Sequence, residues 1–330
     1  MRRLDGWLLV IPLAAAIVVL ATWIAPGDGG PYAILTIFSA HLAIAALAVS
    51  AILALVRGRT VRLGLLVLAV VMAARFGGDW LSLPSTGGPP AFTVATWNME
   101  WDVPGGPDAI EGLAAQDADV IAVQELTPEQ AAAMEASSAV TDRYPFRRLE
   151  PGSTRTGIGL LSRFPLSDIA VETDPPSIRA TVSGDGSRDR ITVLTAHPFS
   201  PRIRTRGPGP IDVPVGYDVS DRDRRIAEIR TRVDAAAALG APVVLIGDLN
   251  TAPTEAADRD LTTGLLDAHV EIGEGPGWTW RPGLIGPIPA GVLRIDRILS
   301  TPDLVPVESR VVCRPVGDHC QVLAGFVPAT

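Results

Sequence analysis

Polar residues follow apolar runs at six places, and their side chains are of the kinds that bind ligands and move protons. The six segments are NME at 98–100, QE at 124–125, TAHP at 195–198, GDLN at 247–250, RIDRI at 294–298 and GDH at 317–319. A single Asn or Asp after a strand is typical of a turn. Six such segments in succession are difficult to explain as turns, because polar groups at strand ends can meet on one rim, where ligands bind. The sequence therefore indicates one site built from distant parts of the chain.

The elements that must position these segments are mostly strands. We expect strands at 92–97, 119–123, 158–161, 169–172, 178–182, 191–196, 243–246, 293–299, 307–312 and 321–327, and helices at 108–116, 128–140 and 221–239. Many strands with few helices over residues 91–330 indicate a two-layer sheet sandwich flanked by helices. The segment 198–218 is rich in Pro, Gly and Arg, and it is long for a connection.

Three apolar stretches precede this region, at about 7–25, 32–56 and 62–83. The first two contain no acidic or Arg residue and are long enough to cross a bilayer, which needs roughly 20 apolar residues. The third reaches that length only with Arg62 and Arg75 extending toward the two membrane surfaces. We therefore predict three transmembrane helices in residues 1–83, followed by a Pro/Gly linker at 84–90. A cleavable signal peptide is the rival interpretation of the first stretch.

The arginines set the expected orientation of these helices. Two precede the first stretch and three lie in the loop at 57–62, whereas the loop at 26–31 contains Asp28 and no Arg. Positively charged loops stay in the cytoplasm, so the N-terminus is expected there, in a multi-pass protein of the cell membrane. After three crossings residues 91–330 lie outside the cytoplasm. If the third stretch did not cross, they would lie inside it.

Charge is distributed unevenly along the chain. All 28 basic residues are Arg. Residues 1–90 carry a net charge of +3, whereas the remainder carries −11, from 22 Arg against 33 acidic residues. An acidic region repels the phosphate backbone, so nucleic acid is not expected as a partner. The same charge suits a site that recruits its own cation.

The six segments, in this order, resemble the pattern of the endonuclease/exonuclease/phosphatase superfamily over about residues 92–326. That superfamily includes deoxyribonuclease-I-like nucleases, sphingomyelinases and inositol polyphosphate phosphatases. The resemblance implies an α/β fold, a four-layer α-β-β-α sandwich, and a Mg²⁺-dependent hydrolase of phosphoric ester or phosphoanhydride bonds. A three-span segment before such a domain further resembles the VanJ-type membrane proteins associated with teicoplanin resistance, which implies a role in the cell envelope and in antibiotic resistance.

The resemblance also implies roles for individual residues. Its metal ligands are Glu125, Asn98 and Asp318, whose oxygen atoms suit Mg²⁺, with Mn²⁺ as an alternative, rather than zinc. Its catalytic residues include His319, which pairs with the phosphate or acts as the base and is oriented by Asp296. Asp248 and Asn250 position the attacking water, and His197 contacts the phosphate. These roles agree with what phosphoryl hydrolysis needs: a cation on the nonbridging oxygens, donors for the developing charge, and a base that places water in line.

Three further arginines, Arg202, Arg204 and Arg206, follow His197 closely and are candidates for binding substrate. Arginine suits a phosphate or pyrophosphate group. With the region tethered to a bilayer, the leading substrate is a lipid (polyprenyl) phosphate or pyrophosphate of the cell envelope. Cleavage of a monoester, a diester or a pyrophosphate remains open.

Two rival functions remain open at this point. One is an extracytoplasmic nuclease or other phosphodiesterase with the same mechanism. The other is a domain that binds envelope ligands without catalysis. In an oxidising exterior, we also expect Cys313 and Cys320 to form a disulfide that clamps the turn at 318–319.

Overall fold

The computed structural model describes residues 8–56, 59–81, 88–103, 106–183, 190–206, 213–281 and 291–329. The chain divides into two compact units, and we describe each by itself. The N-terminal unit comprises Met1–Leu81, Pro201–Asp221 and Ala252–Arg259. The sandwich unit comprises Ser82–Ser200, Arg222–Thr251 and Asp260–Thr330. Most of the predicted linker, residues 84–87, lies outside the described residues.

The N-terminal unit is built on apolar helices. They are α2 (Val10–Ile24), α3 (Gly30–Ile37), α4 (Ser39–Val56) and α5 (Arg59–Trp80). Helices α2, α4 and α5 pack against one another through small and medium side chains that include Ala16, Val19, Ala43 and Leu68. The same unit contains an antiparallel hairpin of β8 (Arg202–Arg206) and β9 (Val213–Asp218), and Gly29 bridges to Asp218 at its end.

Length and composition qualify fewer helices as membrane spans than the sequence predicted. In the described residues, Val61–Trp80 alone is long and apolar enough to cross a bilayer. A second span is counted if Gly30–Ile37 and Ser39–Leu55, which meet at an angle of 64°, form one broken helix. Val10–Ile24 has only 15 residues. The three-span arrangement therefore stays a prediction.

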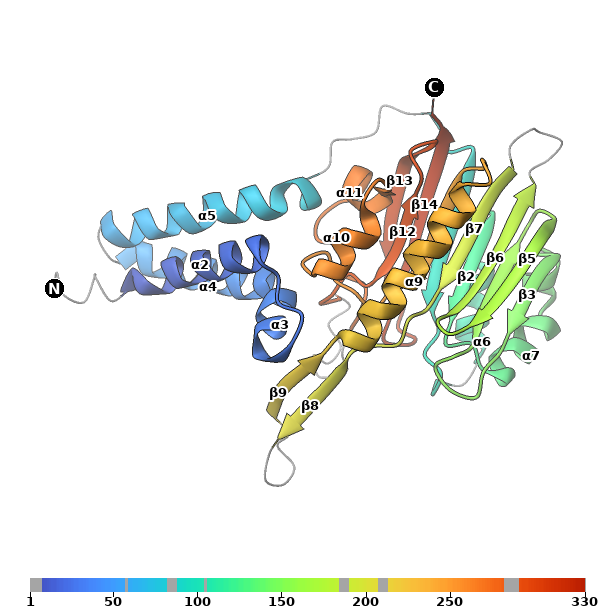
Figure 1. Ribbon diagram of the computed structural model, residues 1–330, viewed down its shortest axis with the longest axis horizontal. Coiled ribbons are helices and arrows are strands. Elements are labelled where there is room, and N and C mark those ends of the chain that lie inside the picture. The colour runs from blue at the N-terminus through green and yellow to red at the C-terminus, as the bar shows by residue number, and fades with distance from the viewer. Residues whose placement is uncertain are drawn as a thin grey trace. The chain divides into compact units, whose positions relative to one another are not determined.

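The sandwich unit contains two six-stranded sheets (Figure 1). The first runs in the order β13 (Leu304–Val312), β14 (Gln321–Pro328), β1 (Phe92–Asn98), β2 (Val120–Gln124), β4 (Ile158–Ser162) and β3 (Phe146–Glu150). The second runs in the order β11 (Leu266–Asp267), β12 (Asp296–Ser300), β10 (Val243–Asp248), β7 (Arg190–Ala196), β6 (Pro176–Ser183) and β5 (Leu166–Thr173). Both sheets are mixed, since β1 pairs parallel with β2 and β7 parallel with β10, while their other pairs are antiparallel.

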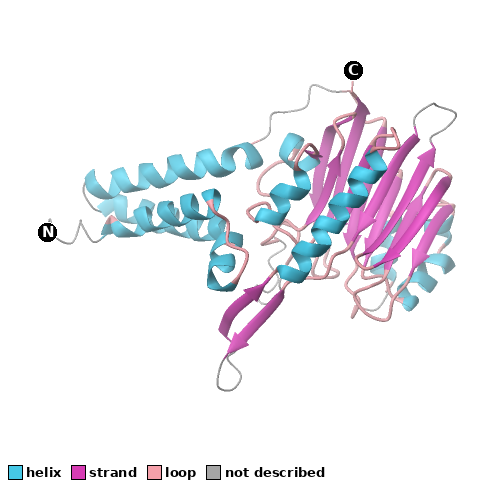
Figure 2. Ribbon diagram, viewed as in Figure 1, coloured by secondary structure: helices cyan, strands magenta, loops and turns pink. Residues whose placement is uncertain are grey.

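Apolar layers hold the sheets and helices together. Between the sheets lie Val94 and Ile158 from the first sheet and Ile178 and Val244 from the second, all buried. A second apolar layer joins the first sheet to α6 (Pro107–Ala114), α7 (Pro128–Ala136) and α8 (Ser138–Thr141). Helix α9 (Ser220–Ala237) runs along the second sheet, as Figures 1 and 2 show, and buries Ile226, Ile229 and Val233. Two short helices follow β10: α10 (Ala256–Thr262), whose first residues belong to the N-terminal unit, and α11 (Ala268–Ile272) of the sandwich unit. Two mixed sheets with flanking helices confirm the predicted α/β sandwich.

Some local predictions were wrong. The segment 198–218 contains the hairpin β8–β9 rather than only a long loop. The helix predicted at 128–140 is interrupted at Ser137, whose backbone is extended (φ −88°, ψ 112°). The predicted strand at 293–299 begins only at Asp296. Strand β3 was not predicted because its sequence, FRRLE, is an edge strand with little apolar content.

Candidate active site

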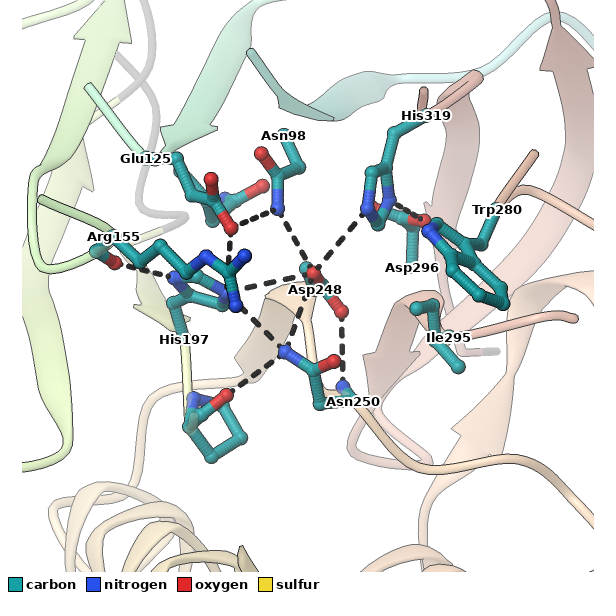
Figure 3. Close-up of polar contacts among 12 residues, drawn as sticks. Asn98, Glu125, Arg155, His197, Asp248, Asn250, Trp280, Ile295, Asp296 and His319 are labelled. Atoms are coloured by element: carbon teal, nitrogen blue, oxygen red, sulfur yellow. Dashed lines mark hydrogen bonds and ion pairs between the residues drawn. The ribbon is translucent and has the colours of Figure 1, made fainter. Parts of the chain in front are cut away.

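The parallel strand pairs bring four of the polar segments to one edge of the sandwich. Asn98 ends β1 and lies opposite Gln124, the last residue of β2, so Glu125 follows at the same edge. In the second sheet, Asp248 ends β10 and lies opposite Asp296 of β12, while His197 follows the neighbouring strand β7. Figure 3 shows these side chains, together with His319, directed toward one another.

Asp248 is the residue to which most of the others connect. Its Oδ2 accepts a hydrogen bond from Asn98 Nδ2 at 3.0 Å and lies 3.5 Å from His197 Nε2 and 3.8 Å from His319 Nε2. Asp248 is 1% exposed. Burial raises the pKa of this carboxyl, but the charge of His319 and the hydrogen bonds from His197 and Asn98 outweigh burial and lower it. Asp248 is therefore ionised at neutral pH.

His319 is held by a second buried carboxylate. Its Nδ1 donates to Asp296 Oδ2 at 2.8 Å, and the carbonyl oxygen of His319 accepts from the buried Trp97 indole at 3.3 Å. Burial lowers the pKa of His319, yet the charges of Asp296 and Asp248 prevail and raise it to about 10. His319 is thus a cation at neutral pH, with Nδ1 on Asp296 and Nε2 facing Asp248.

His197 is fixed from both sides of its ring. Its Nδ1 donates to the carbonyl oxygen of Arg155 at 3.1 Å, which leaves Nε2 directed at the site. Asn250 Nδ2 lies 3.3 Å from that Nε2 and also donates to the carbonyl oxygen of Pro198 at 3.0 Å. Burial lowers the pKa of His197, but Asp248 and Glu125 together raise it.

The local backbone at the site is unusual at several residues. Glu125 and Asn250 adopt the left-handed conformation, with φ of +56° and +49°. Gly247 has a φ of +149°, and a Cβ there would lie 2.2 Å from the carbonyl oxygen of Ala196. The glycine of GDLN is therefore required for β10 to approach β7, and this approach sets Asp248 beside His197.

A buried polar layer beneath the site joins the two sheets. Thr96 Oγ1 donates to Gln124 Oε1 at 3.0 Å, and Gln124 Nε2 donates to Thr195 Oγ1 at 3.3 Å. All three residues are 0% exposed. Because β1 and β2 belong to the first sheet and β7 to the second, this network fixes the separation of the strand ends that carry Asn98 and His197.

The site offers two sets of candidate metal ligands. Glu125 Oε1 accepts from Asn98 Nδ2 at 3.2 Å and its Oε2 from the Trp101 backbone at 3.1 Å, so this carboxylate is held at the rim. Asp248, Asp296 and His319 form a buried group whose candidate ligand atoms lie within 4.8 Å of one another, and its two carboxylates supply the ligand atoms at neutral pH because cationic His319 has no free lone pair. The buried Oδ1 of Asp296 has no hydrogen-bond partner in the described part of the chain. A donor set dominated by carboxylate oxygen fits a hard divalent cation.

Asp318 and Glu100 form a second carboxylate pair beside His319. Asp318 Oδ1 lies 3.7 Å from His319 Nε2, and its Oδ2 accepts from the Trp280 indole at 3.1 Å. Burial and the charges of Asp318 and Asp102 raise the pKa of Glu100 to about 7. The family resemblance implies no role for Glu100, although Glu100 belongs to the first polar segment and this placement could have indicated one.

A disulfide joins Cys313 and Cys320, with their Cα atoms 4.2 Å apart, which confirms the predicted bond. It closes a short loop that contains Asp318 and His319.

The three arginines predicted to bind substrate lie on β8. Arg202 is paired with Asp221 at 3.5 Å, and its side chain is 76% exposed. The side chains of Arg204 and Arg206 fall outside what the structure describes. All three belong to the N-terminal unit, and their role stays a prediction.

Comparison with known proteins shows the family of this chain. The model of the Endonuclease/Exonuclease/phosphatase family matches residues 95–319, so the chain belongs to this family. A search of curated proteins found no match.

Several solved structures have the same fold. One is the 3′ phosphatase NExo from Neisseria bound to a product DNA hairpin, at 20% identity and a TM-score of 0.54, covering 72% of this chain and 100% of that one. The structure of D. rerio TDP2 complexed with a single-strand DNA product has 18% sequence identity and a TM-score of 0.55, and the match covers 72% of this chain and 98% of that one. An AP endonuclease from Archaeoglobus fulgidus has 16% sequence identity and a TM-score of 0.53, and the match covers 71% of this chain and 99% of that one.

Proposed function

We propose that this chain is a membrane-anchored, divalent-metal-dependent phosphoesterase or pyrophosphatase with an extracytoplasmic site, acting on a lipid-linked (polyprenyl) phosphate or pyrophosphate. One observation carries the hydrolytic part of the proposal. Asp248 lies within 3.8 Å of both imidazoles and accepts a hydrogen bond from Asn98, so groups from distant segments face one point. Family membership limits the chemistry to that of nucleases and phosphatases.

The charges of the site suit attack of water on phosphorus. Asp248 is ionised and, with Asn250, orients the attacking water. Cationic His319, held by Asp296, and His197 donate to phosphoryl oxygens as negative charge develops there. A bond forms between the water oxygen and phosphorus while the Asp248 carboxylate accepts a proton from that water. The bond to the leaving oxygen breaks, and the leaving oxygen takes the electron pair and then a proton. Glu125 and Asn98, which are 3.2 Å apart, would hold a divalent cation, which would neutralise nonbridging oxygens. Asp318, which lies beside His319, is the third ligand that the family pattern implies.

The surface of the N-terminal helices supports anchoring in a membrane. Large aliphatic side chains are exposed, among them Leu55 (83%), Ile24 (79%) and Ile52 (65%). Inside the helix packing lie small or weakly polar residues such as Ala43 and Thr36, both 0% exposed. Water disfavours such an arrangement, whereas lipid favours large apolar groups outside and small residues at helix contacts.

Two observations support an exterior location of the sandwich unit. The arginines near the apolar stretches fit a cytoplasmic N-terminus. The bond between Cys313 and Cys320 is typical of an oxidising compartment. Thiol titration of the unreduced protein is expected to find no free cysteine, and two free thiols would contradict this location.

The hairpin supports a lipid-linked substrate. Strand β8 carries Arg202, Arg204 and Arg206, and the hairpin shares a compact unit with the apolar helices. This combination fits a phosphate group at the surface of a bilayer. A role in envelope lipid metabolism, and through it in antibiotic resistance, belongs to the same proposal.

Purified full-length protein in detergent tests the proposal. With Mg²⁺ we expect release of phosphate from a polyprenyl pyrophosphate, and loss of that release in His319→Ala. Replacing the three β8 arginines by Ala is expected to impair lipid pyrophosphate hydrolysis much more than hydrolysis of a chromogenic diester. Equal losses would refute the role of the arginines. An envelope phenotype that survives both Glu125→Ala and His319→Ala would favour ligand binding over catalysis.

A nuclease is the second candidate. Two structures with this fold contain DNA products, which favours it. The net charge of −11 over residues 91–330 opposes it. Incubation of the same preparation with single- and double-stranded DNA and Mg²⁺ separates the two candidates, since the lipid phosphatase is expected to leave both DNAs intact.

A further inference from the structure

Arg222, near the start of α9, is a buried cation that the proposed mechanism does not use. It is 2% exposed, although a helix of this composition normally turns its arginines to solvent. Its Nε donates to Asp223 Oδ1 at 2.6 Å, and its NH1 donates to the carbonyl oxygen of Asn250 at 2.5 Å. A buried guanidinium is costly unless it is bonded, so a contact to a loop carbonyl at this depth indicates a specific task.

The carbonyl that Arg222 holds belongs to the residue whose conformation the site depends on. Asn250 is left-handed (φ +49°), and its amide N–H donates to Asp248 Oδ1 at 2.9 Å. Its carboxamide Nδ2 contacts His197 Nε2, the Pro198 carbonyl oxygen and Asp248 Oδ2, at 3.0 to 3.4 Å. A shift of the Asn250 main chain, which this carbonyl anchors, would displace the amide N–H and the carboxamide together.

We infer that Arg222 is a positioning residue, whose guanidinium locks the carbonyl of Asn250 and thereby aims the Asn250 carboxamide between His197 and Asp248. This rests on the proposed function in one respect, that Asn250 acts in hydrolysis. Arg222 contacts the backbone carbonyl of Asn250, and its effect on the substrate passes through Asn250.

The same helix provides a matched control. Arg232 NH1 donates to the Pro175 carbonyl oxygen at 2.9 Å and to Ser177 Oγ at 2.7 Å, and its NH2 donates to the Asp174 carbonyl oxygen at 2.9 Å. Arg232 therefore also joins α9 to backbone carbonyls, but at residues that carry no chemistry. Its replacement removes a comparable set of hydrogen bonds without touching Asn250.

The test compares Arg222→Met, Arg222→Lys and Arg232→Met in the full-length protein. For Arg222→Met we expect kcat to fall by about 10- to 100-fold, because a small misplacement of a catalytic group is enough for such a loss, with KM changed less than about threefold. Arg222→Lys, which keeps a donor for the carbonyl, is expected to recover part of kcat. Arg232→Met is expected to keep the wild-type kcat, although its melting temperature should fall by about as much as that of Arg222→Met. Equal kcat values for the two Met variants would overturn the inference.

Two further measurements separate this inference from the proposed function. In an Asn250→Ala background, Arg222→Met is expected to lower kcat less than about twofold, because its effect passes through Asn250. A full additional loss would overturn the positioning role. If the wild type hydrolyses no phosphate ester, the proposed function fails. In that case, hydrogen exchange at the backbone amide of Asn250 still tests the role of Arg222. Faster exchange in Arg222→Met than in Arg232→Met supports the inference, and equal exchange overturns it.

Discussion

Replacement of Asp267 tests how the strand that carries Asp296 is anchored. This carboxylate is 7% exposed and accepts hydrogen bonds from two buried arginines that flank Asp296 in sequence. Arg294 NH1 contacts both carboxylate oxygens at 2.8 and 2.9 Å, and Arg297 contacts Oδ2 through Nε at 3.0 Å and through NH2. The backbone N–H of His269 also donates to Oδ1 at 2.9 Å, so Asp267 caps α11 as well.

Replacement of Asp267 by Asn removes the charge and keeps the shape. Arg294 and Arg297 are 4% and 3% exposed. In the variant both guanidinium groups stay buried but lose the negative charge of this carboxylate. Breaking a buried pair in this way costs about 3–5 kcal/mol of the free energy of unfolding. We expect that loss at pH 7 in urea unfolding of the full chain in detergent, followed by near-ultraviolet circular dichroism.

The pH dependence gives an independent check of the same cluster. Burial raises the pKa of Asp267, but Arg294 and Arg297 outweigh it and hold that pKa far below its usual range. The carboxylate therefore stabilises the fold above the unfolded-state pKa of about 3.9, and this contribution disappears as the pH falls from there toward the folded-state value. The wild type is expected to lose stability over that acidic window more steeply than Asp267→Asn.

An exposed pair supplies the control for this prediction. Asp234, paired with Arg230 one helical turn away at 2.8 Å, is mostly exposed, so Asp234→Asn should change the free energy of unfolding little. A loss below about 1 kcal/mol in Asp267→Asn, or identical acid sensitivity in the variant and the wild type, would refute the reasoning.

Three other predictions concern the frame of the site. Gly247→Ala is expected to abolish hydrolysis and lower the melting temperature, since the new Cβ would meet the Ala196 carbonyl oxygen at 2.2 Å; a folded, fully active variant would contradict the steric argument. Gln124→Leu leaves two buried threonine hydroxyls without this partner and should cost about 1–3 kcal/mol in urea unfolding, whereas unchanged stability would show that the layer beneath the site is dispensable. Reduction of the Cys313–Cys320 bond should lower stability by about 2 kcal/mol together with activity, and thermal unfolding with and without reductant measures this.

The sequence was informative where burial and residue type leave few choices. Buried runs such as 92–97 and 243–246 are strands in the structure, and polar residues directly after them converge as expected. The pairing of Asp296 with His319 followed from the family pattern, and the two side chains are 2.8 Å apart.

The remaining features depend on tertiary contacts that local sequence does not encode. The hairpin β8–β9 has a Pro/Gly/Arg composition that is typical of loops, so strand pairing there could not be predicted from propensity. Gln124 was recognised as part of a polar segment, but its bond to Thr195 joins two sheets and needs their packing. Arg222 lies on a helix rich in charge, where arginines usually face solvent, and its contact with Asn250 depends on how α9 packs against the loop after β10.

The central claim is that residues from Asn98 to His319 form one metal-assisted site for phosphate ester hydrolysis. The most direct measurement is the rate of phosphate release by the full-length protein with Mg²⁺, compared with the rate in a chelator and the rate of Asp248→Asn. The account predicts at least about a 100-fold loss in both comparisons, because Asp248 connects both imidazoles and Asn98. An Asp248→Asn protein that is folded and as active as the wild type would contradict it.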